Sequence, residues 1–184
     1  MRSAVFLDRD GVLNEDKKYA SDPKIAKLLP GVTSAVKRLN DAGMAVIVVS
    51  NQSGIARGYH TENDTRAFNA ELDEQLRAEG ARVDGWYYCP HLPEGTVAEY
   101  AKECDCRKPK SGMLMQAAGE HDIDLSKSFM VGDKDRDIAA GSAAGAKTIL
   151  VGDAISDTEP LPTHTAADLS EAVILILRGA GVVA

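Results

Sequence analysis

The sequence has few cysteines, no surplus of positive charge and no long apolar run. Its three cysteines all lie between positions 89 and 106, and an odd number makes a poor disulfide framework. A net charge of −7, from 21 Lys and Arg against 28 Asp and Glu, argues against nucleic-acid binding, which needs a basic face. The apolar run at residues 172–177 is far too short to span a bilayer, and residues 1–3 lead into a predicted strand without a secretory leader. We therefore expect a soluble cytoplasmic enzyme that binds neither nucleic acid nor membrane.

Short apolar segments alternate with segments of helical spacing along the 184 residues. Near-continuous apolar runs predict buried strands at residues 4–7, 44–49, 83–88, 129–131 and 147–151. Apolar residues at helical spacing predict helices at residues 32–42, 61–79, 111–121, 135–144 and 166–177. This alternation is typical of an α/β protein with a doubly wound parallel sheet. With no repeat or linker, residues 1–184 are predicted to form one domain without a large cap, interrupted by irregular segments at residues 11–30, 89–110 and 153–165.

Two carboxylates follow the first predicted strand and mark a candidate site. Asp8 and Asp10 are two residues apart, and Gly11 comes next. In an open parallel sheet, ligands bind at the carboxyl ends of the strands. Two carboxylates this close repel each other unless a cation or a proton separates them, so a divalent metal or an acid/base division of labour would suit the pair. Taken alone, Asp-x-Asp-Gly is more often a simple turn or a calcium-type loop than a catalytic motif.

Polar residues also follow three later strands. Ser50-Asn51 ends the second strand, Arg107-Lys108 comes in the segment after the third, and Asp133 follows the fourth. Each has an ordinary explanation by itself, as a turn, a solvated loop lysine or the start of a helix. Because the carboxyl ends of parallel strands face the same edge, the four groups are expected to meet there.

Phosphoryl transfer is the chemistry that these groups could share. Asp8 would attack phosphorus and form an aspartyl phosphate, with a metal held by Asp8 and Asp133 to neutralise charge. Asp10 would protonate the leaving alkoxide and later accept a proton from the hydrolytic water. The phosphate oxygens would be held by Ser50, Asn51 and Lys108.

The cysteines and one histidine form two close pairs in the segment at residues 89–110. Cys89 and His91 make the first pair, and Cys104 and Cys106 make the second. Three thiolates and one imidazole form a Cys₃His set that is typical of a closed, structural Zn²⁺ site. A chance arrangement or a redox-sensitive Cys-x-Cys motif would explain the same sequence. Zinc would then position Arg107-Lys108, which follow Cys106 directly. The other histidines lack such partners and are predicted to lie at the surface: His60, His121 and His164.

Taken together, these motifs resemble a known enzyme family over residues 4–152. Asp8-Arg9-Asp10-Gly11, Ser50-Asn51, Lys108 and Gly132-Asp133-x-x-x-Asp137 match the four motifs of the haloacid dehalogenase (HAD) superfamily of phosphatases. The resemblance implies a HAD-like Rossmannoid core, catalytic Mg²⁺ and an aspartyl-phosphate intermediate. It also implies that the backbone carbonyl of Asp10 ligates Mg²⁺ with Asp8 and Asp133, and that Asp137 lies just outside the metal's ligands.

Within this superfamily, the zinc segment narrows the resemblance to two groups. They are the D-glycero-D-manno-heptose 1,7-bisphosphate 7-phosphatases and the histidinol-phosphate phosphatases. Residues 51–59, 87–91, 104–109 and 132–134 look like the heptose group. This implies hydrolysis of the C7 phosphate of a sugar bisphosphate, with histidinol phosphate or another small sugar phosphate as the alternative.

A bisphosphate substrate needs positive charge beyond the phosphate that reacts, and Arg57, Arg107 and Lys134 are candidates to supply it. The resemblance to the heptose group implies further substrate contacts from Asp16, Lys17, Lys18, Tyr19, Gln52 and Ser53. A non-catalytic zinc-binding module would not need the complete set of four motifs. A phosphotransferase or mutase usually needs a cap that excludes water, and this chain lacks the length for one, so hydrolysis is the expectation. The compact single domain allows a monomer.

Overall fold

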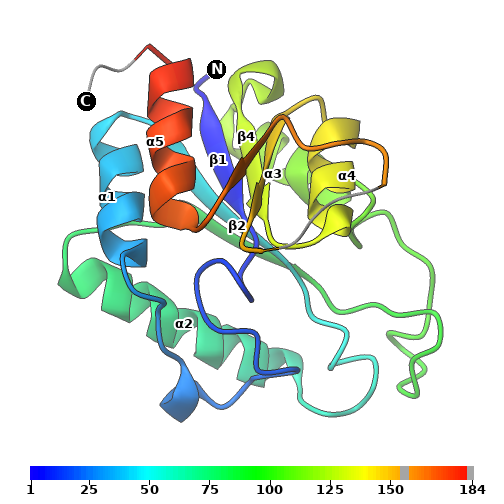
Figure 1. The fold of residues 1–184 in the computed structure, drawn as a ribbon. Helices are drawn as coiled ribbons and strands as arrows, with labels where there is room; N and C mark the ends of the chain where they lie inside the picture. The colour runs from blue at the N-terminus through cyan, green and yellow to red at the C-terminus, as the bar shows by residue number, and fades with distance from the viewer. Residues whose placement is uncertain (154–157, 182–184) are drawn as a thin grey trace.

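The computed structural model describes residues 1–153 and 158–181, and its centre is one parallel sheet of six strands (Figure 1). The strands are β1 (Ala4–Leu7), β2 (Ala45–Asn51), β3 (Gly85–Cys89), β4 (Phe129–Gly132), β5 (Lys147–Val151) and β6 (His164–Ala166). Their order in the sheet is β3-β2-β1-β4-β5-β6. The chain therefore winds outward from β1 in one direction and then, from β4, in the other. This confirms the predicted doubly wound α/β fold.

Helices cover both faces of the sheet. They are α1 (Val32–Asp41), α2 (Glu62–Ala78), α3 (Gly112–His121), α4 (Asp135–Ala143) and α5 (Leu169–Gly179), with short 3₁₀ turns at Pro23–Ile25 and Leu125–Lys127. In Figure 1, α1 and α5 lie on one side of the strands and α3 and α4 on the other. None of the helices in the described ranges is both long and apolar enough to cross a membrane.

The core is divided between the two faces of the sheet by the alternation of side chains along each strand. In β1, Val5 and Leu7 pack in the cluster that includes α1 and α5, whereas Ala4 and Phe6 pack in the cluster that includes α3 and α4. All four side chains are 0% exposed. Parallel strands that are buried on both faces read as continuous apolar runs, which is why the short segment at residues 4–7 could be recognised.

The last part of the chain differs from the prediction. Residues 153–165 were expected to be a loop and the last helix to begin at residue 166, but Ala166 pairs with Val151 in the edge strand β6. The helix α5 begins at Leu169, because the Asp168 side chain accepts a hydrogen bond from the Glu171 N–H at 2.9 Å and acts as its N-cap. A strand of only three residues has too little pattern to be recognised. Residues 154–157 of the predicted loop lie outside the described residues.

The prediction that His60 lies at the surface was wrong. Its side chain is 8% exposed and directly precedes Thr61, the N-cap of α2. A Cβ atom at Gly54 would lie 2.2 Å from the His60 Cε1 atom, so the loop after β2 passes directly over the imidazole ring. His60 thus occupies the position before a helix N-cap where a hydrophobic residue commonly packs. Of the other two histidines, His164 is exposed and His121 is half-buried.

Candidate active site and metal centre

The direction of the strand order reverses between β1 and β4. Two aspartates of the candidate site, Asp8 and Asp133, lie at the ends of these two strands. Asp8 follows β1, and its backbone N–H donates to Val131 O of β4 at 3.0 Å. Asp133 follows β4. A Cβ atom at Gly11, which has a φ of +86°, would lie 2.3 Å from Asp133 Oδ2, so only glycine allows the Asp8–Gly11 turn to approach this carboxylate. In doubly wound sheets, such a reversal leaves a crevice at the carboxyl ends of the strands where ligands bind.

Asp8 is an enclosed carboxylate beside a lysine. It is 3% exposed, its Oδ1 accepts from the Arg9 N–H at 2.8 Å, and the same oxygen lies 2.9 Å from Lys108 Nζ. Burial raises the pKa of Asp8 to about 7, because the Lys108 charge offsets the loss of hydration only in part and the charges of Asp137 and Asp10 add to the rise. A cation placed beside Asp8 would therefore favour its ionised, nucleophilic form.

Lys108 reaches from the irregular segment after β3 into the interior. Its side chain is almost fully buried, and Nζ contacts Asp8 Oδ1 at 2.9 Å, Asp137 Oδ1 at 2.7 Å and Val49 O at 2.7 Å. Burial alone would lower the pKa of this lysine, but the two carboxylates together outweigh burial, and the pKa is raised. Lys108 is thus held as a cation between two carboxylates.

The three carboxylates Asp8, Asp133 and Asp137 offer oxygens that lie within 4.8 Å of one another. Lys108, together with Lys134 at 2.7 Å from Asp133 Oδ2, supplies two positive charges against three negative ones, so a further cation would balance the cluster. Asp133 Oδ1 is buried and has no hydrogen-bond partner among the described residues, as expected for a metal ligand. In contrast, Asp137 Oδ1 contacts Lys108, and Asp137 Oδ2 accepts from the Lys134 N–H at 3.1 Å. The carboxylate donors therefore fit Mg²⁺, and Asp137 serves to hold Lys108.

The residues that end β2 contact Gln52 and Lys108. Ser50 is 2% exposed, and its Oγ accepts from Gln52 Nε2 at 2.7 Å. The Asn51 side chain donates to Lys108 O at 2.9 Å and accepts from the Lys108 N–H at 3.0 Å. The side-chain amide of Asn51 therefore fixes the backbone of Lys108, although Asn51 was predicted to hold the phosphate itself. Ser50, in contrast, lies beside Gln52 at the edge of the site.

Asp10 is held by a network of N–H donors. Arg9 Nη2 donates to both oxygens at 3.0 and 2.8 Å, Asn14 Nδ2 donates to Oδ1 at 2.9 Å and Gln52 Nε2 donates to Oδ2 at 3.1 Å. Since Gln52 also contacts Ser50, Asp10 lies beside the end of β2. The Arg9 side chain that holds Asp10 is itself enclosed, because it is 1% exposed and its guanidinium carbon lies 4.5 Å from the centre of the Phe68 ring. The second carboxylate of the motif thus has a fixed position.

A cavity of about 420 Å³ opens at this edge of the sheet. Its lining residues are Asp10, Asp16, Lys18, Tyr19, Asn51, Gln52, Ser53, Arg107 and Arg136. All of them except Arg136 belong to the predicted set. Lys18 and Tyr19 have φ angles of +43° and +61°, which are uncommon for residues other than glycine, so the loop makes a sharp turn where it reaches the cavity.

Five predicted substrate residues do not line this cavity: Ser50 and Lys108, which are buried at the strand ends, and Lys134, Arg57 and Lys17. Lys134 is half-exposed, and its Nζ lies 2.7 Å from Asp133 Oδ2. The Arg57 guanidinium carbon lies 5.9 Å from the centre of the Tyr19 ring. Lys17 forms an ion pair with Glu15 at 3.4 Å.

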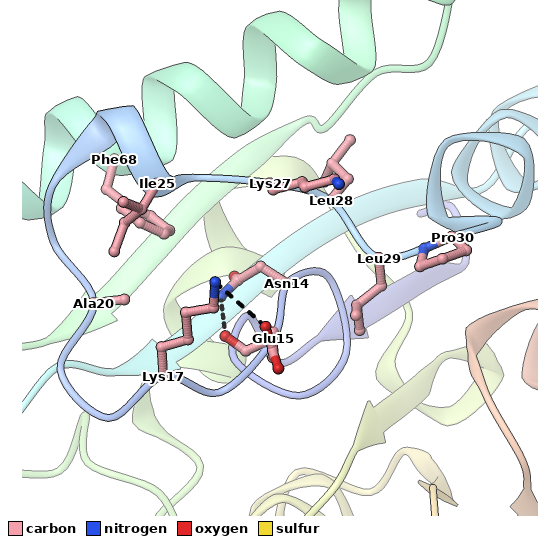
Figure 2. Close-up of a pocket in the computed structure, with 10 residues that line it drawn as sticks. All are labelled: Asn14, Glu15, Lys17, Ala20, Ile25, Lys27, Leu28, Leu29, Pro30 and Phe68. Atoms are coloured by element: carbon pink, nitrogen blue, oxygen red, sulfur yellow. Dashed lines mark hydrogen bonds and ion pairs between the residues drawn. The ribbon is translucent and has the colours of Figure 1, made fainter.

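Lys17 lines a different cavity, which has a volume of about 340 Å³. This cavity lies between residues 14–30 and helix α2 (Figure 2). The wall of this cavity is mainly apolar, with Ile25, Leu28 and Phe68 among its members, and it contains neither Asp10 nor an arginine. Asn14 connects the two cavities, because its side chain lines this one and donates to Asp10. We therefore expect a phosphate ester to bind in the cavity that contains Asp10.

The predicted zinc ligands form one compact cluster. The three cysteine sulfurs lie 3.1, 3.3 and 3.5 Å apart, and His91 Nδ1 lies 3.4 Å from Cys106 Sγ and 3.7 Å from Cys89 Sγ. Tetrahedral Zn²⁺ bonds of normal length separate such donors by about 3.5–3.8 Å. Hydrogen bonds from the neighbouring thiols lower the pKa of Cys106 to about 5, which favours the thiolate form that metals bind. This Cys₃His cluster is consistent with a zinc site.

One direct contact connects the cluster to the cavity. Arg107 follows Cys106, and its Nη1 donates to the backbone carbonyl of His91 at 3.2 Å. A Cβ atom at Gly112 would lie 2.3 Å from Asp105 O, so the segment folds back tightly against the start of α3. The shape of this segment and the position of Arg107 therefore depend on each other.

The sequence reasoning assigned no role to some residues that complete the site. Arg9 stands inside the first motif, and Asn14 lies four residues beyond Asp10, but no local pattern connects either side chain to that carboxylate. Asp137 lies one helical turn beyond Asp133, and this spacing did indicate its proximity to the metal site. Arg136 could have been found only by knowing which side of α4 faces the cavity.

The order of strand ends, the Asp8–Lys108–Asp137 contacts and the fold define a HAD-type phosphatase. A HAD-hydrolase-like family model matches residues 105–172.

The chain belongs to the D-glycero-D-manno-heptose 1,7-bisphosphate 7-phosphatase family. It is 47% identical over 148 residues to such a phosphatase of Haemophilus ducreyi, covering 80% of this chain and 81% of the relative. It is also 47% identical to one of Thermosynechococcus vestitus, covering 94% of each chain. The crystal structure of D,D-heptose 1,7-bisphosphate phosphatase from B. bronchiseptica, complexed with magnesium and phosphate, superposes with a TM-score of 0.82 at 32% identity, covering 96% of this chain and 99% of that one.

Proposed function

We propose that this chain is a Mg²⁺-dependent phosphatase that removes the C7 phosphate of D-glycero-D-manno-heptose 1,7-bisphosphate through an aspartyl phosphate. The observation that carries the proposal is the buried Asp8 carboxylate, 2.9 Å from Lys108 Nζ and next to the unpartnered oxygen of Asp133. Nucleophile, cation and metal ligand thus lie together at the edge of the sheet where ligands bind. The heptose relatives support the choice of substrate.

In the proposed mechanism, an Asp8 oxygen attacks phosphorus and the bond to the sugar oxygen breaks. Asp10 gives its proton to the departing sugar alkoxide. Asp10 then takes a proton from water as the water oxygen attacks the phosphorus of the aspartyl phosphate, which releases inorganic phosphate and restores Asp8. Mg²⁺, held by Asp8, Asp133 and the backbone carbonyl of Asp10, would supply positive charge to the phosphate oxygens.

Lys108 and Ser50 would hold the transferred phosphate, and neighbouring residues would hold these two in place. Support comes from the contacts of Lys108, which is fixed by Asp137 on its side chain and by Asn51 on its backbone. Such fixed charges stabilise the charge that develops in phosphoryl transfer without the need to reorganise during the reaction.

Replacement of Asp10 with asparagine should slow both proton transfers. With p-nitrophenyl phosphate, the leaving group needs no proton, so aspartyl-phosphate formation should continue while its hydrolysis slows by about 10²–10⁴-fold. We expect a burst of nitrophenolate stoichiometric with enzyme, followed by slow turnover, and a phosphoenzyme visible by intact mass spectrometry. Because the variant also loses the buried ion pair with Arg9, its melting temperature should be measured and the burst counted per folded molecule. Wild-type steady-state turnover without a burst would contradict the assignment.

We propose that the Cys₃His cluster holds structural Zn²⁺ and that the enzyme contains one domain and acts as a monomer. Four protein ligands would leave no open position on the zinc. All proposed site residues come from one chain, so no second copy is needed. Free thiols, rather than disulfides, suit the reducing cytoplasm.

Initial rates with Mg²⁺ on four substrates would test the proposed function. These are α- and β-heptose 1,7-bisphosphate, heptose 7-phosphate and histidinol phosphate. We expect the highest kcat/KM for one of the bisphosphates, with phosphate released from C7 and heptose 1-phosphate as the product. Preference for histidinol phosphate would instead support the alternative, since that substrate is cationic and gains little from the basic residues at the cavity.

A further inference from the structure

Arg136 was not among the predicted site residues, yet it lines the 420 Å³ cavity together with Arg107 and Lys18. We propose that Arg136 binds the phosphate that is not transferred and is a specificity residue for bisphosphate substrates. This inference rests on the proposed function and adds to it a residue that distinguishes a sugar bisphosphate from its monophosphate.

Most of the other cations near the strand ends are already engaged. Lys108 is enclosed by two carboxylates and a carbonyl, and Arg9 binds Asp10 and donates to Asn69 at 3.1 Å. Lys134 lies 2.7 Å from a carboxylate oxygen of Asp133. Arg57 is placed above the Tyr19 ring and does not line the cavity. None of these four is free to bind a second phosphate at the cavity.

Arg136 differs from these cations. It is exposed, and its side chain forms no hydrogen bond or ion pair within residues 1–153 and 158–181. Arg107 also lines the cavity, but one of its nitrogens already donates to His91 O. All five N–H donors of Arg136 are thus available, and a guanidinium can bind two phosphate oxygens in a bidentate arrangement that an ammonium group cannot reproduce.

The position of Arg136 in its helix is not explained by helix stability. It is the second residue of α4, between Asp135 and Asp137. The N-terminal end of a helix carries partial positive charge, so aspartate is favoured in this first turn and arginine is disfavoured. A function in the cavity would account for a cation at this place.

The charges around the cavity favour binding of a second phosphate by its three cations. Its lining contains three cations, Lys18, Arg107 and Arg136, and two carboxylates, Asp10 and Asp16, which leaves a surplus of one positive charge. Removal of the Arg136 charge would leave none. The transferred phosphate has Lys108 and the metal, whereas a second phosphate would depend on this surplus.

The test compares Arg136→Gln with wild type on heptose 1,7-bisphosphate and heptose 7-phosphate. We expect kcat/KM for the bisphosphate to fall at least about tenfold more than kcat/KM for the monophosphate, mainly through KM, because a charge-assisted hydrogen bond to the second phosphate is lost. Arg136→Lys should recover part of the selectivity by restoring the charge without the planar fork.

Arg178→Gln is the matched control. It removes the same charge from the last turn of α5, which Figure 1 shows beside the N-terminus, at the opposite edge of the sheet from the strand ends, and should change neither substrate's kinetics. Equal losses on both substrates, or no loss, in Arg136→Gln would overturn the inference while the proposed function stands. If the wild type itself shows no preference for the bisphosphate over the monophosphate, the proposed function fails and the inference fails with it.

Discussion

Asp8→Asn is expected to lower kcat by about 10⁴-fold or more on every phosphate ester, because an amide oxygen does not attack phosphorus and removal of an enzymatic nucleophile has effects of this order. The change is nearly isosteric and leaves Lys108 its contacts with Asp137 and Val49 O. Turnover would be followed by phosphate release with excess Mg²⁺. Substantial residual Mg²⁺-dependent activity would falsify the assignment of Asp8 as the nucleophile.

The fold of this variant can be checked separately from its chemistry. In the folded protein without metal, burial raises the pKa of Asp8 from its usual 3.8 to about 7. The stability that this group contributes is therefore full below pH 3.8 and is lost as the pH rises through about 7. At pH 8 in EDTA, the neutral amide that replaces the carboxylate avoids that loss, and the variant should melt no lower than wild type. Added Mg²⁺ should raise the melting temperature of wild type more than that of the variant.

A matched control for Asp8→Asn is Asp122→Asn. It makes the same chemical change at an exposed carboxylate with a left-handed backbone, a conformation that asparagine adopts readily. This control should keep wild-type kinetics, so that a loss confined to the Asp8 variant reports on the chemistry at that position.

The parallel sheet could be predicted from the sequence because its strands are buried on both faces. Residues 4–7 and 129–131 read as continuous apolar runs, and the structure places β1 and β4 at these positions. The third strand begins at Gly85 and not at the predicted residue 83. The Asp84 side chain accepts a hydrogen bond from the Val46 N–H at 2.9 Å, in place of the backbone carbonyl of a paired strand. The short edge strand β6 was missed because three residues carry no usable periodicity. Boundaries and edges thus depend on side-chain contacts that a local pattern does not contain.

The part of the candidate site that could be predicted from the sequence consists of the residues at the ends of strands. Asp8, Ser50 and Asp133 follow apolar runs, so the topology of the sheet alone brings them together. Arg9 and Arg136 do not follow from this reasoning, because their relation to the site depends on the direction of a long side chain. The burial of His60 depends on how the loop after β2 folds over it. These positions are set by tertiary packing and not by local sequence.

Removal of the proposed structural zinc should affect substrate binding more than the chemical step. In the described segment from residue 90 to residue 110, only Leu92 and Lys108 are buried, so little apolar packing would hold the segment without metal. Structural Zn²⁺ contributes on the order of 10 kcal/mol of binding free energy in small zinc-dependent folds. Without it, the backbone around Cys106 and the His91 carbonyl would lose its fixed position, and Arg107 would be misplaced.

Cys106→Ser tests this expectation. We expect the variant to bind less than one zinc per chain and its kcat/KM for the bisphosphate to fall on the order of 10²-fold, since small displacements of binding groups have effects of this size. The loss on p-nitrophenyl phosphate should be much smaller, because Asn51, Asp8 and Asp137 still hold Lys108 at 2.7–3.0 Å from outside the zinc segment. Kinetics in excess Mg²⁺, with the zinc content of the same samples, would measure both effects.

Asp105→Asn is the control within the zinc segment, because Asp105 lies between two proposed ligands but its side chain is 96% exposed. It should retain zinc and wild-type kinetics. If zinc-free Cys106→Ser keeps the wild-type kcat and KM on both substrates, the segment does not position Arg107. If both substrates lose activity equally, the zinc site supports Lys108 as well, and the contacts from Asn51 and Asp137 are too weak to hold that lysine alone. A loss confined to the bisphosphate would mean that the zinc segment serves recognition of the second phosphate, while the strand ends carry the chemistry.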